Sequence, residues 1–226
     1  MSTQQFLRVD KVDIISDIHG CYKEFMGLVA KLGYKNMFSP DMYHPDGRTL
    51  VIAGDVTDRG YDNLSCFEFA LEKCVYGPHV WIRGNHCDKL FRALKGNPVI
   101  MADGLRGTFS ELKNAYTPEY LKRMGEYLDS HIPTKAVFDG GNLIVAHACP
   151  PSKKVNDHIY GPGNRERWWE DYDGHAFAVF GHYWFNDTEP RENWCCIDNS
   201  TCEERDLVAF RYPEKKTIKM EYSGHE

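Results

Sequence analysis

Seven short polar segments, spread over most of the 226-residue chain, carry the side chains whose types and spacing could do chemistry. They contain carboxylates, imidazoles and an amide, which bind divalent metals, and arginines, whose planar guanidinium can hold two phosphate oxygens at once. A pair of metals and a phosphate ester need this combination, so the sequence predicts a two-metal phosphoesterase site. The segments are 16–20 (SDIHG), 54–60 (GDVTDRG), 83–86 (RGNH), 146–148 (AHA), 164–167 (NRER), 181–182 (GH) and 196–198 (CID).

Six of these side chains are candidate metal ligands. Asp17 and His19 are two positions apart at the end of a predicted strand, so both can face one side while Ile18 packs on the other. Asp55 can place its two oxygens on two ions, which in such sites lie ~3.5–4 Å apart and activate a water. Oxygen and imidazole ligands suit manganese best in our interpretation, with iron, zinc or nickel as alternatives. The predicted ligands are Asp17, His19, Asp55, Asn85, His147 and His182.

Any one of these histidines, taken alone, could equally be a packing residue. The joint pattern favours ligands, because each lies beside small residues at the end of a predicted strand. The remaining histidines outside the motifs lack that setting, and we interpret them as surface or packing residues. They are His44, His79, His131, His158, His175 and His225.

Apolar runs precede most of the polar segments and predict the strands that must position them. Strands at 12–15, 49–53 and 79–82 alternate with helices at 22–32 and 63–74, which is typical of parallel βαβ units in an α/β fold. Ligand sites in open α/β sheets form at the carboxyl ends of the strands, where these motifs fall.

The second half of the chain has a different pattern. Residues 88–131 have helical spacing and no strand pattern, and we interpret 88–135 as a helical cap inserted into a single domain of residues 1–226. A hairpin is expected at 136–146 with its turn at 139–142. Further strands are predicted at 177–180, 194–197, 207–210 and 217–220.

Composition limits the partners. The net charge of −6 argues against a broad electrostatic grip on nucleic acid, although a short nucleic-acid end could still be a substrate. The N-terminus has no apolar signal core, and no run approaches the ~20 apolar residues of a membrane span, so we expect a cytoplasmic protein without a membrane partner. The eight scattered cysteines are expected to be reduced, with Cys195 and Cys196 pointing to opposite faces of a strand.

The motifs resemble those of the calcineurin-like metallophosphoesterases, in particular the phosphoprotein phosphatase family. That family is recognised by Gly-Asp-x-His-Gly, Gly-Asp-x-x-Asp-Arg-Gly and Gly-Asn-His-Glu, followed by two later histidines. Here Ser16 replaces the first glycine, Cys87 the glutamate, and Tyr183 a usual threonine. The resemblance covers nearly the whole chain and implies a four-layer α/β/β/α sandwich.

Several segments point to particular branches. Segment 164–167 is similar to small bacterial and phage Ser/Thr protein phosphatases. Segments 89–96, 138–141, 169–172 and 210–214 resemble the phosphatase domain of bacterial polynucleotide kinase-phosphatases. Symmetrical diadenosine tetraphosphatases share the core motifs.

Carried over residue by residue, the resemblance assigns two metal sites that share Asp55. It also implies that His86 is the general acid, that Asp58 orients it, and that Asp198 is an active-site aspartate. The arginines expected to hold phosphate oxygens are Arg59, Arg83 and Arg165.

Alternatives stay open at several positions. Arg59 could only cap the following helix, Arg83 could pair with a surface acid, and Arg167 could replace Arg165 as the phosphate clamp. Asp198 could only fix the end of its strand. Three tryptophans could stack a base or an aryl phosphate, or simply pack in the core; they are Trp168, Trp169 and Trp184.

The expected function is therefore metal-dependent hydrolysis of a phosphomonoester, on a protein or on a nucleotide or RNA end, by a water that two metals activate. The alternative is hydrolysis of a symmetrical dinucleoside tetraphosphate. A non-catalytic phosphate-binding module is disfavoured, because His86, Asp58 and all six ligands are present. The oligomeric state is left open.

Overall fold

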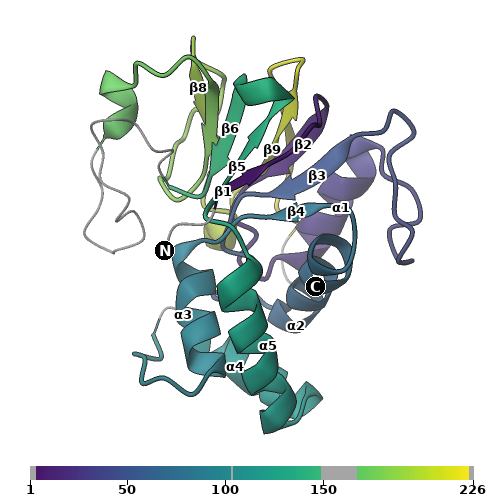
Figure 1. Cartoon of the computed structure of the whole chain (residues 1–226), viewed down its shortest axis with the longest axis vertical. Helices are drawn as coiled ribbons and strands as arrows, with labels where there is room; N and C mark the ends of the chain where they lie inside the picture. The colour runs from purple at the N-terminus through teal and green to yellow at the C-terminus, as the bar shows by residue number, and fades with distance from the viewer. Residues whose placement is uncertain (1–3, 103, 149–166, 224–226) are drawn as a thin grey trace.

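The fold is built on two five-stranded sheets, seen in a computed structural model that describes residues 4–102, 104–148 and 167–223 (Figure 1). The first sheet has the strand order β10-β9-β2-β3-β4 and the second has the order β1-β5-β6-β7-β8. The first sheet contains β2 (Val12–Ile15), β3 (Thr49–Ile52), β4 (Val80–Trp81), β9 (Leu207–Tyr212) and β10 (Lys216–Met220). The second contains β1 (Gln4–Phe6), β5 (Lys135–Phe138), β6 (Leu143–Ala146), β7 (Phe177–Phe180) and β8 (Trp194–Cys196).

Parallel pairing brings the motif-bearing strand ends together. Strands β2, β3 and β4 pair in parallel, as do β6, β7 and β8, so their carboxyl ends share one edge within each sheet. Strands β9 and β10 close the first sheet in antiparallel pairing. The predicted hairpin is confirmed, because β5 and β6 pair antiparallel across a 3-10 turn at Asp139–Gly141.

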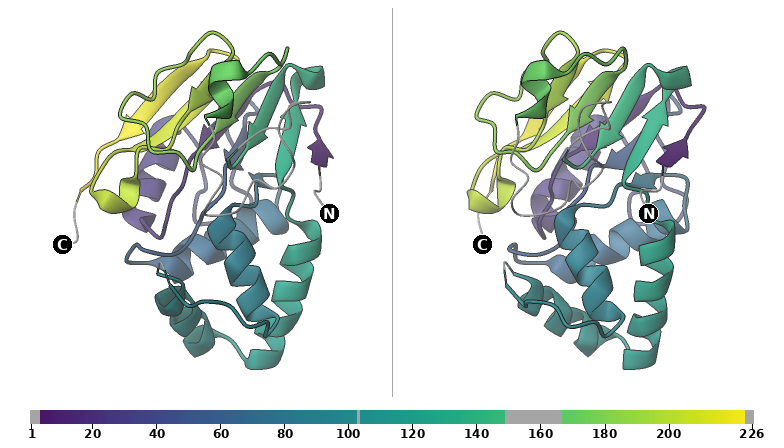
Figure 2. Two further views of the ribbon diagram at one scale, coloured as in Figure 1. Left: turned by 90° about the vertical axis from the view of Figure 1, so that its left-hand side faces the viewer. Right: turned by 60° about the vertical axis from the view of Figure 1, so that its left-hand side comes forward.

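The two sheets pack face to face around an apolar core (Figure 2). Every second residue of a strand points to the same face, so Val12 and Ile14 of β2 meet Phe138 and Val145 of the hairpin in this core. Cys195 belongs to this inner core and Cys196 to the outer face of the second sheet, as the alternation predicted.

Helices cover the outer face of the first sheet, where residues such as Ile15 and Ile52 join the largest core cluster. Helices α3, α4 and α5 gather beyond the sheets as a separate group (Figures 1 and 2). The helices are α1 (Tyr22–Leu32), α2 (Asn63–Ala70), α3 (Asn85–Leu94), α4 (Leu105–Ala115) and α5 (Pro118–His131).

The outer face of the second sheet is covered differently from the four-layer expectation. In the described part of the chain this layer is a single 3-10 turn at Trp168–Asp171, which packs both tryptophans against Phe180. The prediction of an α/β fold with two packed sheets is confirmed, and the fourth layer is short.

Some element boundaries differ from the sequence prediction. The helix at 22–32 is confirmed, whereas the helix predicted at 63–74 ends at Ala70 and continues as a π-helical turn, Leu71–Val75. Strand β1 was missed, because its three residues carry no apolar alternation and depend on parallel pairing with β5. Across the described residues, no helix combines the length and apolar character that a membrane crossing requires.

Candidate metal centre and phosphate pocket

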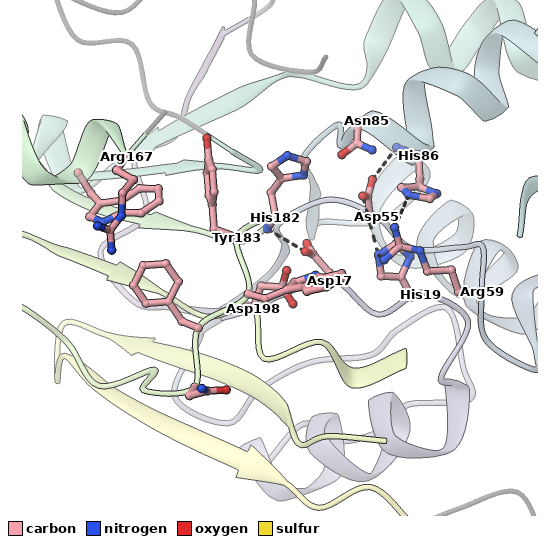
Figure 3. Close-up of a pocket in the computed structure, with 14 residues that line it drawn as sticks. Asp17, His19, Asp55, Arg59, Asn85, His86, Arg167, His182, Tyr183 and Asp198 are labelled. Carbon is pink, nitrogen blue, oxygen red and sulfur yellow. Dashed lines mark hydrogen bonds and ion pairs between the residues drawn. The ribbon is translucent and has the colours of Figure 1, made fainter. Parts of the chain in front are cut away.

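The motif loops meet in a cavity of about 490 Å³ at the carboxyl ends of the strands (Figure 3). Asp17 and His19 follow β2, Asp55 follows β3, and Asn85 begins α3 just after β4. His147 follows β6 and is fully buried behind the cavity wall. The predicted residues that line the cavity are Asp17, His19, Asp55, Arg59, Asn85, His86, His182 and Asp198.

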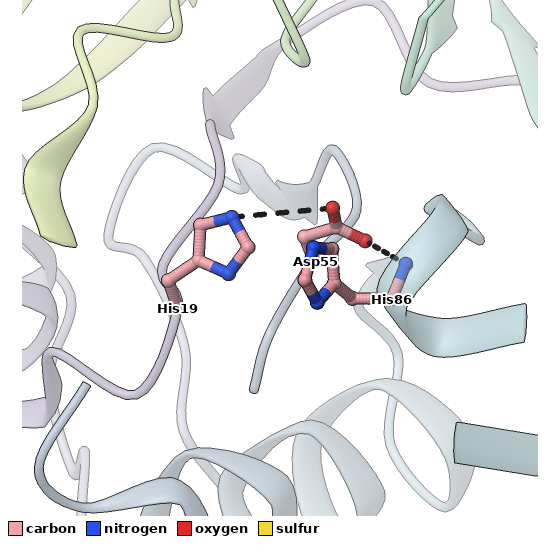
Figure 4. A group of neighbouring side chains, drawn as sticks. All are labelled: His19, Asp55 and His86. Carbon is pink, nitrogen blue, oxygen red and sulfur yellow. Dashed lines mark hydrogen bonds and ion pairs between the residues drawn. The ribbon is translucent and has the colours of Figure 1, made fainter. Parts of the chain in front are cut away.

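Asp55 lies at the centre of this group. Its Oδ2 is 3.3 Å from His147 Nε2 and 4.0 Å from His19 Nε2, so two imidazoles lie near one oxygen; Figure 4 shows the side of Asp55 that faces His19 and His86. Its Oδ1 accepts a hydrogen bond from the backbone N–H of His86 at 2.9 Å. Asp55 belongs both to a cluster with His19 and His86 and to one with His147 and His182, and in each cluster the ligand atoms lie within 4.8 Å of one another. The sequence predicted that Asp17 would join His19 and Asp55, whereas in the structure His86 completes that cluster.

Two histidines are oriented by the backbone. His19 Nδ1 lies 3.1 Å from Thr57 O, and His147 Nδ1 lies 3.0 Å from Ala53 O. A carbonyl oxygen only accepts, so Nδ1 carries a proton in each ring and Nε2 is the nitrogen left to bind a metal. This arrangement is typical of metal-ligating histidines, whose second nitrogen is held by a backbone carbonyl.

Asp17 provides a first test of whether a metal fits. Its Oδ2 accepts a hydrogen bond from the backbone N–H of His182 at 2.8 Å. Its Oδ1 is buried and accepts no hydrogen bond from the described residues. This oxygen lies 3.2 Å from His147 Nδ1 in an ion pair without hydrogen-bond geometry, and a cation would supply the partner that a buried carboxylate oxygen needs.

The charges in the cluster give a second test. Burial disfavours a charged imidazole, yet the Asp55 and Asp17 carboxylates raise the pKa of His147 well above its usual value. Burial would raise the pKa of Asp17, but the neighbouring His147 lowers it to about 2. The donor set is therefore negative enough to attract cations, and it fits a divalent metal pair.

Asp198 is buried against the same group. Burial and the nearby Asp17 carboxylate raise the pKa of Asp198 well above its usual value. Its Oδ1 accepts a hydrogen bond from the backbone N–H of Ser200 at 2.8 Å. Asp198 thus lines the cavity and also fixes the loop after β8. The sequence left open whether it is an active-site aspartate or only fixes the end of its strand, and its position is compatible with both roles.

Two motif glycines are needed because ligands pass close to the backbone. A Cβ at Gly54 would lie 2.1 Å from His147 Nδ1, and a Cβ at Gly84 would lie 2.0 Å from Asp55 Oδ1. Gly54 also has a φ of +116°, which side chains rarely allow.

His86 and Asp58 form a buried pair beside the ligands. His86 Nδ1 lies 2.7 Å from Asp58 Oδ2, and the other oxygen, Oδ1, accepts a hydrogen bond from Thr108 Oγ1 at 2.6 Å. Sequence reasoning missed Thr108, because it lies on α4 in the predicted cap, where no motif marks it. None of the described cavity-lining residues comes from 88–135, so this region supports the site from behind.

Of the arginines predicted to bind phosphate, Arg59 faces the cavity and Arg83 does not. Arg59 has a guanidinium nitrogen 3.2 Å from His86 Nε2 and another 3.5 Å from His19 Nε2, so it faces the cavity between two imidazoles. Arg83 was predicted to hold phosphate, but the structure directs it away from the cavity. Its guanidinium lies 3.0 Å from Asp129 and 3.6 Å from Asp88, in the surface ion pair that was the open alternative.

The remaining candidates lie around the rim. Arg165 lies outside the described residues, whereas Arg167 lines the cavity and pairs with Glu170 at 2.8 Å. Trp168 and Trp169 are buried in an aromatic cluster on the second sheet, although Trp169 also borders the cavity. Trp184 lines the cavity and is 54% exposed.

Comparisons with known proteins identify the family of this chain. The family model described as calcineurin-like phosphoesterase matches residues 10–225. The chain is 34% identical to the asymmetrical bis(5'-nucleosyl)-tetraphosphatase PrpE of Bacillus velezensis, over 93% of this chain and 92% of the relative. It is also 34% identical to the Bacillus subtilis protein of the same name, over 92% of this chain and 93% of that one.

Solved structures show the same fold. A putative diadenosine tetraphosphatase superimposes with a TM-score of 0.70 at 19% identity, covering 99% of this chain and 100% of the other. A serine/threonine phosphatase from Saccharomyces cerevisiae gives a TM-score of 0.59 at 12% identity, covering 100% of this chain and 85% of the other. The chain therefore belongs to the calcineurin-like phosphoesterase family, and it is a hydrolase of phosphoester bonds whose family uses a divalent metal centre.

Proposed function

We propose that this chain hydrolyses a dinucleoside 5',5'-tetraphosphate, splitting it asymmetrically into a nucleoside monophosphate and a nucleoside triphosphate. The observation that carries the proposal is the 34% identity, over 93% of this chain, with a protein named for that reaction. The sequence alone favoured a phosphomonoester and offered the symmetrical tetraphosphate as its alternative. The proposal keeps the substrate class of that alternative but changes the bond that is cut.

The metal pair is assigned to the six predicted ligands. Asp55 would contribute to both sites, with Asp17 and His19 holding one ion and Asn85, His147 and His182 holding the other. When bound, the ions supply positive charge to the phosphoryl oxygens and lower the pKa of a water. Manganese suits this mixture of carboxylate, amide and imidazole, and iron, zinc and nickel are accepted by the same donors.

His86 is assigned to the leaving group. Its Nε2 faces the cavity, while its Nδ1 is held by the fully buried Asp58 at 2.7 Å. Asp58 accepts from Nδ1–H and so fixes the ring with Nε2 toward the cavity, where it can pass a proton to the departing oxygen. A polyphosphate leaves readily without being protonated. The proton from His86 therefore matters most for substrates with poorer leaving groups.

Arg59 is assigned to the non-bridging oxygens of the phosphate under attack. It reaches into the cavity beside His86 and His19, and its fork can hold two oxygens of one phosphate. Asp198 is assigned to shaping the floor next to Asp17. Arg83 has no place in this assignment, because Asp129 and Asp88 hold its guanidinium.

The cavity also supports a substrate longer than one phosphate. Arg59 and Arg167 both line it, and Figure 3 shows them at opposite ends with His182 and Asp17 between them. A tetraphosphate carries negative charge along a chain, which two separated arginines can share, whereas a phosphomonoester needs one. The volume of about 490 Å³ falls within the range of small-molecule sites.

Product analysis tests the proposal. Manganese-loaded protein is given P1,P4-di(adenosine-5') tetraphosphate, a phosphoserine peptide and an RNA 2',3'-cyclic phosphate, and the products are separated by anion-exchange chromatography. We expect AMP and ATP in equal amounts from the first substrate, and much slower turnover of the other two. ADP as the sole product would show symmetrical cleavage, and preferential turnover of the peptide or the RNA would restore the sequence-based prediction.

A further inference from the structure

The two ends of the cavity have different chemistry. Figure 3 shows His19, Arg59 and His86 at one end and Arg167 and Tyr183 at the other. The metal ligands and the His86–Asp58 pair occupy the first end and the middle. The second end, which we call the distal end, has Arg167 and Tyr183, and the cavity lining also contains aromatic side chains to which the assignment gives no role: Trp169, Trp184 and Phe185.

Trp184 is the distinctive aromatic residue of the cavity lining. Its relative exposure is 54%, whereas Trp168 and Trp169 are 6% and 7% exposed within the outer core. Among the large apolar side chains exposed in the described residues, only Trp184 lines this cavity. Leaving an indole in water beside a hydrolytic site has an energetic cost, and a flat apolar ligand would remove it.

The backbone on either side holds Trp184 in place. The N–H of Tyr183 donates to Gly181 O at 2.7 Å, and the N–H of Phe185 donates to Asp198 O at 3.0 Å. The rings of Tyr183 and Phe185 pack against Trp169, with centroids 4.6 and 5.3 Å apart. Because its neighbours are fixed, Trp184 is presented without a large ordering cost when a ligand binds.

Arg167 brings positive charge to the distal end of the same cavity. Its guanidinium pairs with Glu170 at 2.8 Å, but both side chains are more than half exposed, at 69% and 55%. An exposed pair of this kind is weak, so a phosphate can compete for the arginine. A flat ring and an available guanidinium in the lining of one cavity match a nucleotide, which carries a base and phosphates.

We propose that Trp184 and Arg167 form a nucleotide subsite, in which the indole stacks on a nucleobase and the guanidinium contacts the phosphates of the same nucleotide. This inference rests on the proposed function, because a dinucleoside tetraphosphate places a second nucleotide beyond the phosphate held at the metals. A phosphopeptide would place a flexible backbone there and has no purine to stack. Trp184 is then a specificity-determining residue.

Calorimetric titration tests the subsite without turnover. The manganese-loaded protein is titrated with α,β-methylene-ATP and, separately, with inorganic tripolyphosphate, which carries no base. We expect Trp184→Ala to weaken binding of the nucleotide analogue about 5- to 100-fold, the range for stacking of one base, and to leave tripolyphosphate unchanged. Trp184→Phe should keep most of the affinity, and Arg167→Ala should weaken both ligands.

Phe38→Ala is the matched control, because Phe38 is 81% exposed and does not line the cavity. It should change neither affinity. The subsite is wrong if wild-type protein does not bind the analogue, or if Trp184→Ala weakens both ligands equally or neither of them.

Kinetics separate this inference from the proposed function. In Trp184→Ala, kcat/KM for the dinucleoside tetraphosphate should fall in the same range, whereas Phe38→Ala, outside the cavity, should leave it unchanged. If wild-type protein leaves the tetraphosphate intact, the proposed function is wrong, and the calorimetric comparison still decides whether Trp184 binds a base.

Discussion

Asp58 is held between two partners, with His86 Nδ1 2.7 Å from one carboxylate oxygen and Thr108 Oγ1 2.6 Å from the other. Asp58 and Thr108 are fully buried and His86 is nearly so. The hydroxyl reaches in from α4, so a helix that contributes nothing to the cavity lining nevertheless fixes the residue that orients the proposed acid.

His86→Ala should retain metal but lose most turnover of poor leaving groups. General acid catalysis typically contributes ~10²–10⁴-fold, and an alkyl phosphate needs that proton more than an aryl phosphate does. Rates on a series of esters with leaving groups of increasing pKa provide the measurement. Equal rates for variant and wild type on an alkyl phosphate would remove His86 from this role.

Thr108→Val should lower kcat about tenfold with little change in KM. The variant leaves one buried oxygen of Asp58 without its donor, which costs on the order of 1–3 kcal/mol, and about 1.4 kcal/mol corresponds to tenfold in rate. Thr108→Ser keeps the hydroxyl and should restore most of the rate. A purely structural role predicts instead that both variants lower the thermal midpoint and leave the dependence on leaving-group pKa unchanged.

Arg59→Ala and Arg83→Ala should have opposite effects. Arg59 faces the cavity, so its loss should lower kcat/KM at least tenfold, as expected for a lost charge-assisted contact, with little change in stability. Arg83 pairs with Asp129, so its loss should cost about 1–3 kcal/mol in the free energy of unfolding and leave kcat/KM within about twofold. Urea unfolding and steady-state kinetics on both variants provide the comparison, and the reverse result would return Arg83 to the phosphate.

The stability of the chain should fall in mild acid because of His79. Burial lowers the pKa of His79 to about 4, from 6.5 in the unfolded chain, and its Nδ1 accepts the backbone N–H of Leu50 at 3.2 Å. Between these two values the unfolded state binds a proton that the folded state does not. This contribution is therefore present above about pH 6.5 and is lost as the pH falls toward 4, by roughly 2 kcal/mol between pH 7 and pH 5.

His79→Asn tests this assignment, because an amide oxygen can still accept from Leu50 but does not titrate in this range. Urea unfolding at pH 7, 6 and 5 gives the free energy of unfolding of wild type and variant. The difference between the two proteins in how steeply this free energy falls with pH is the contribution of His79. If the free energy of unfolding falls equally in both proteins, His79 does not cause the acid sensitivity.

The sequence predicted the site where strand ends carry polar side chains. Asp17, His19 and Asp55 follow apolar strands, and parallel pairing of β2 with β3 brings them together as expected. Thr108 could not be predicted, because its position depends on how α4 packs against the loop after β3. The sequence also could not show whether Arg83 faces the phosphate or an acidic side chain. Its partner Asp129 lies 46 positions away along the chain, so their pairing depends on the fold.

The cap shows a similar limit. Helical spacing over 88–131 correctly predicted helices, but spacing does not say which face of the domain they cover. They pack on one another, α3 against α5, and onto the first sheet. The side wall of the cavity comes instead from the loop after β7, where Trp184 is exposed between the buried Tyr183 and the half-buried Phe185.

Anomalous diffraction from a crystal soaked in manganese tests the two-metal account most directly. We predict two manganese peaks ~3.5–4 Å apart, with Asp55 reaching both, Asp17 and His19 beside one, and Asn85, His147 and His182 beside the other. Crystals of Asp55→Asn, soaked in the same way, should lose occupancy at both positions together. A single peak, or a pair that Asp55 does not bridge, would contradict the account.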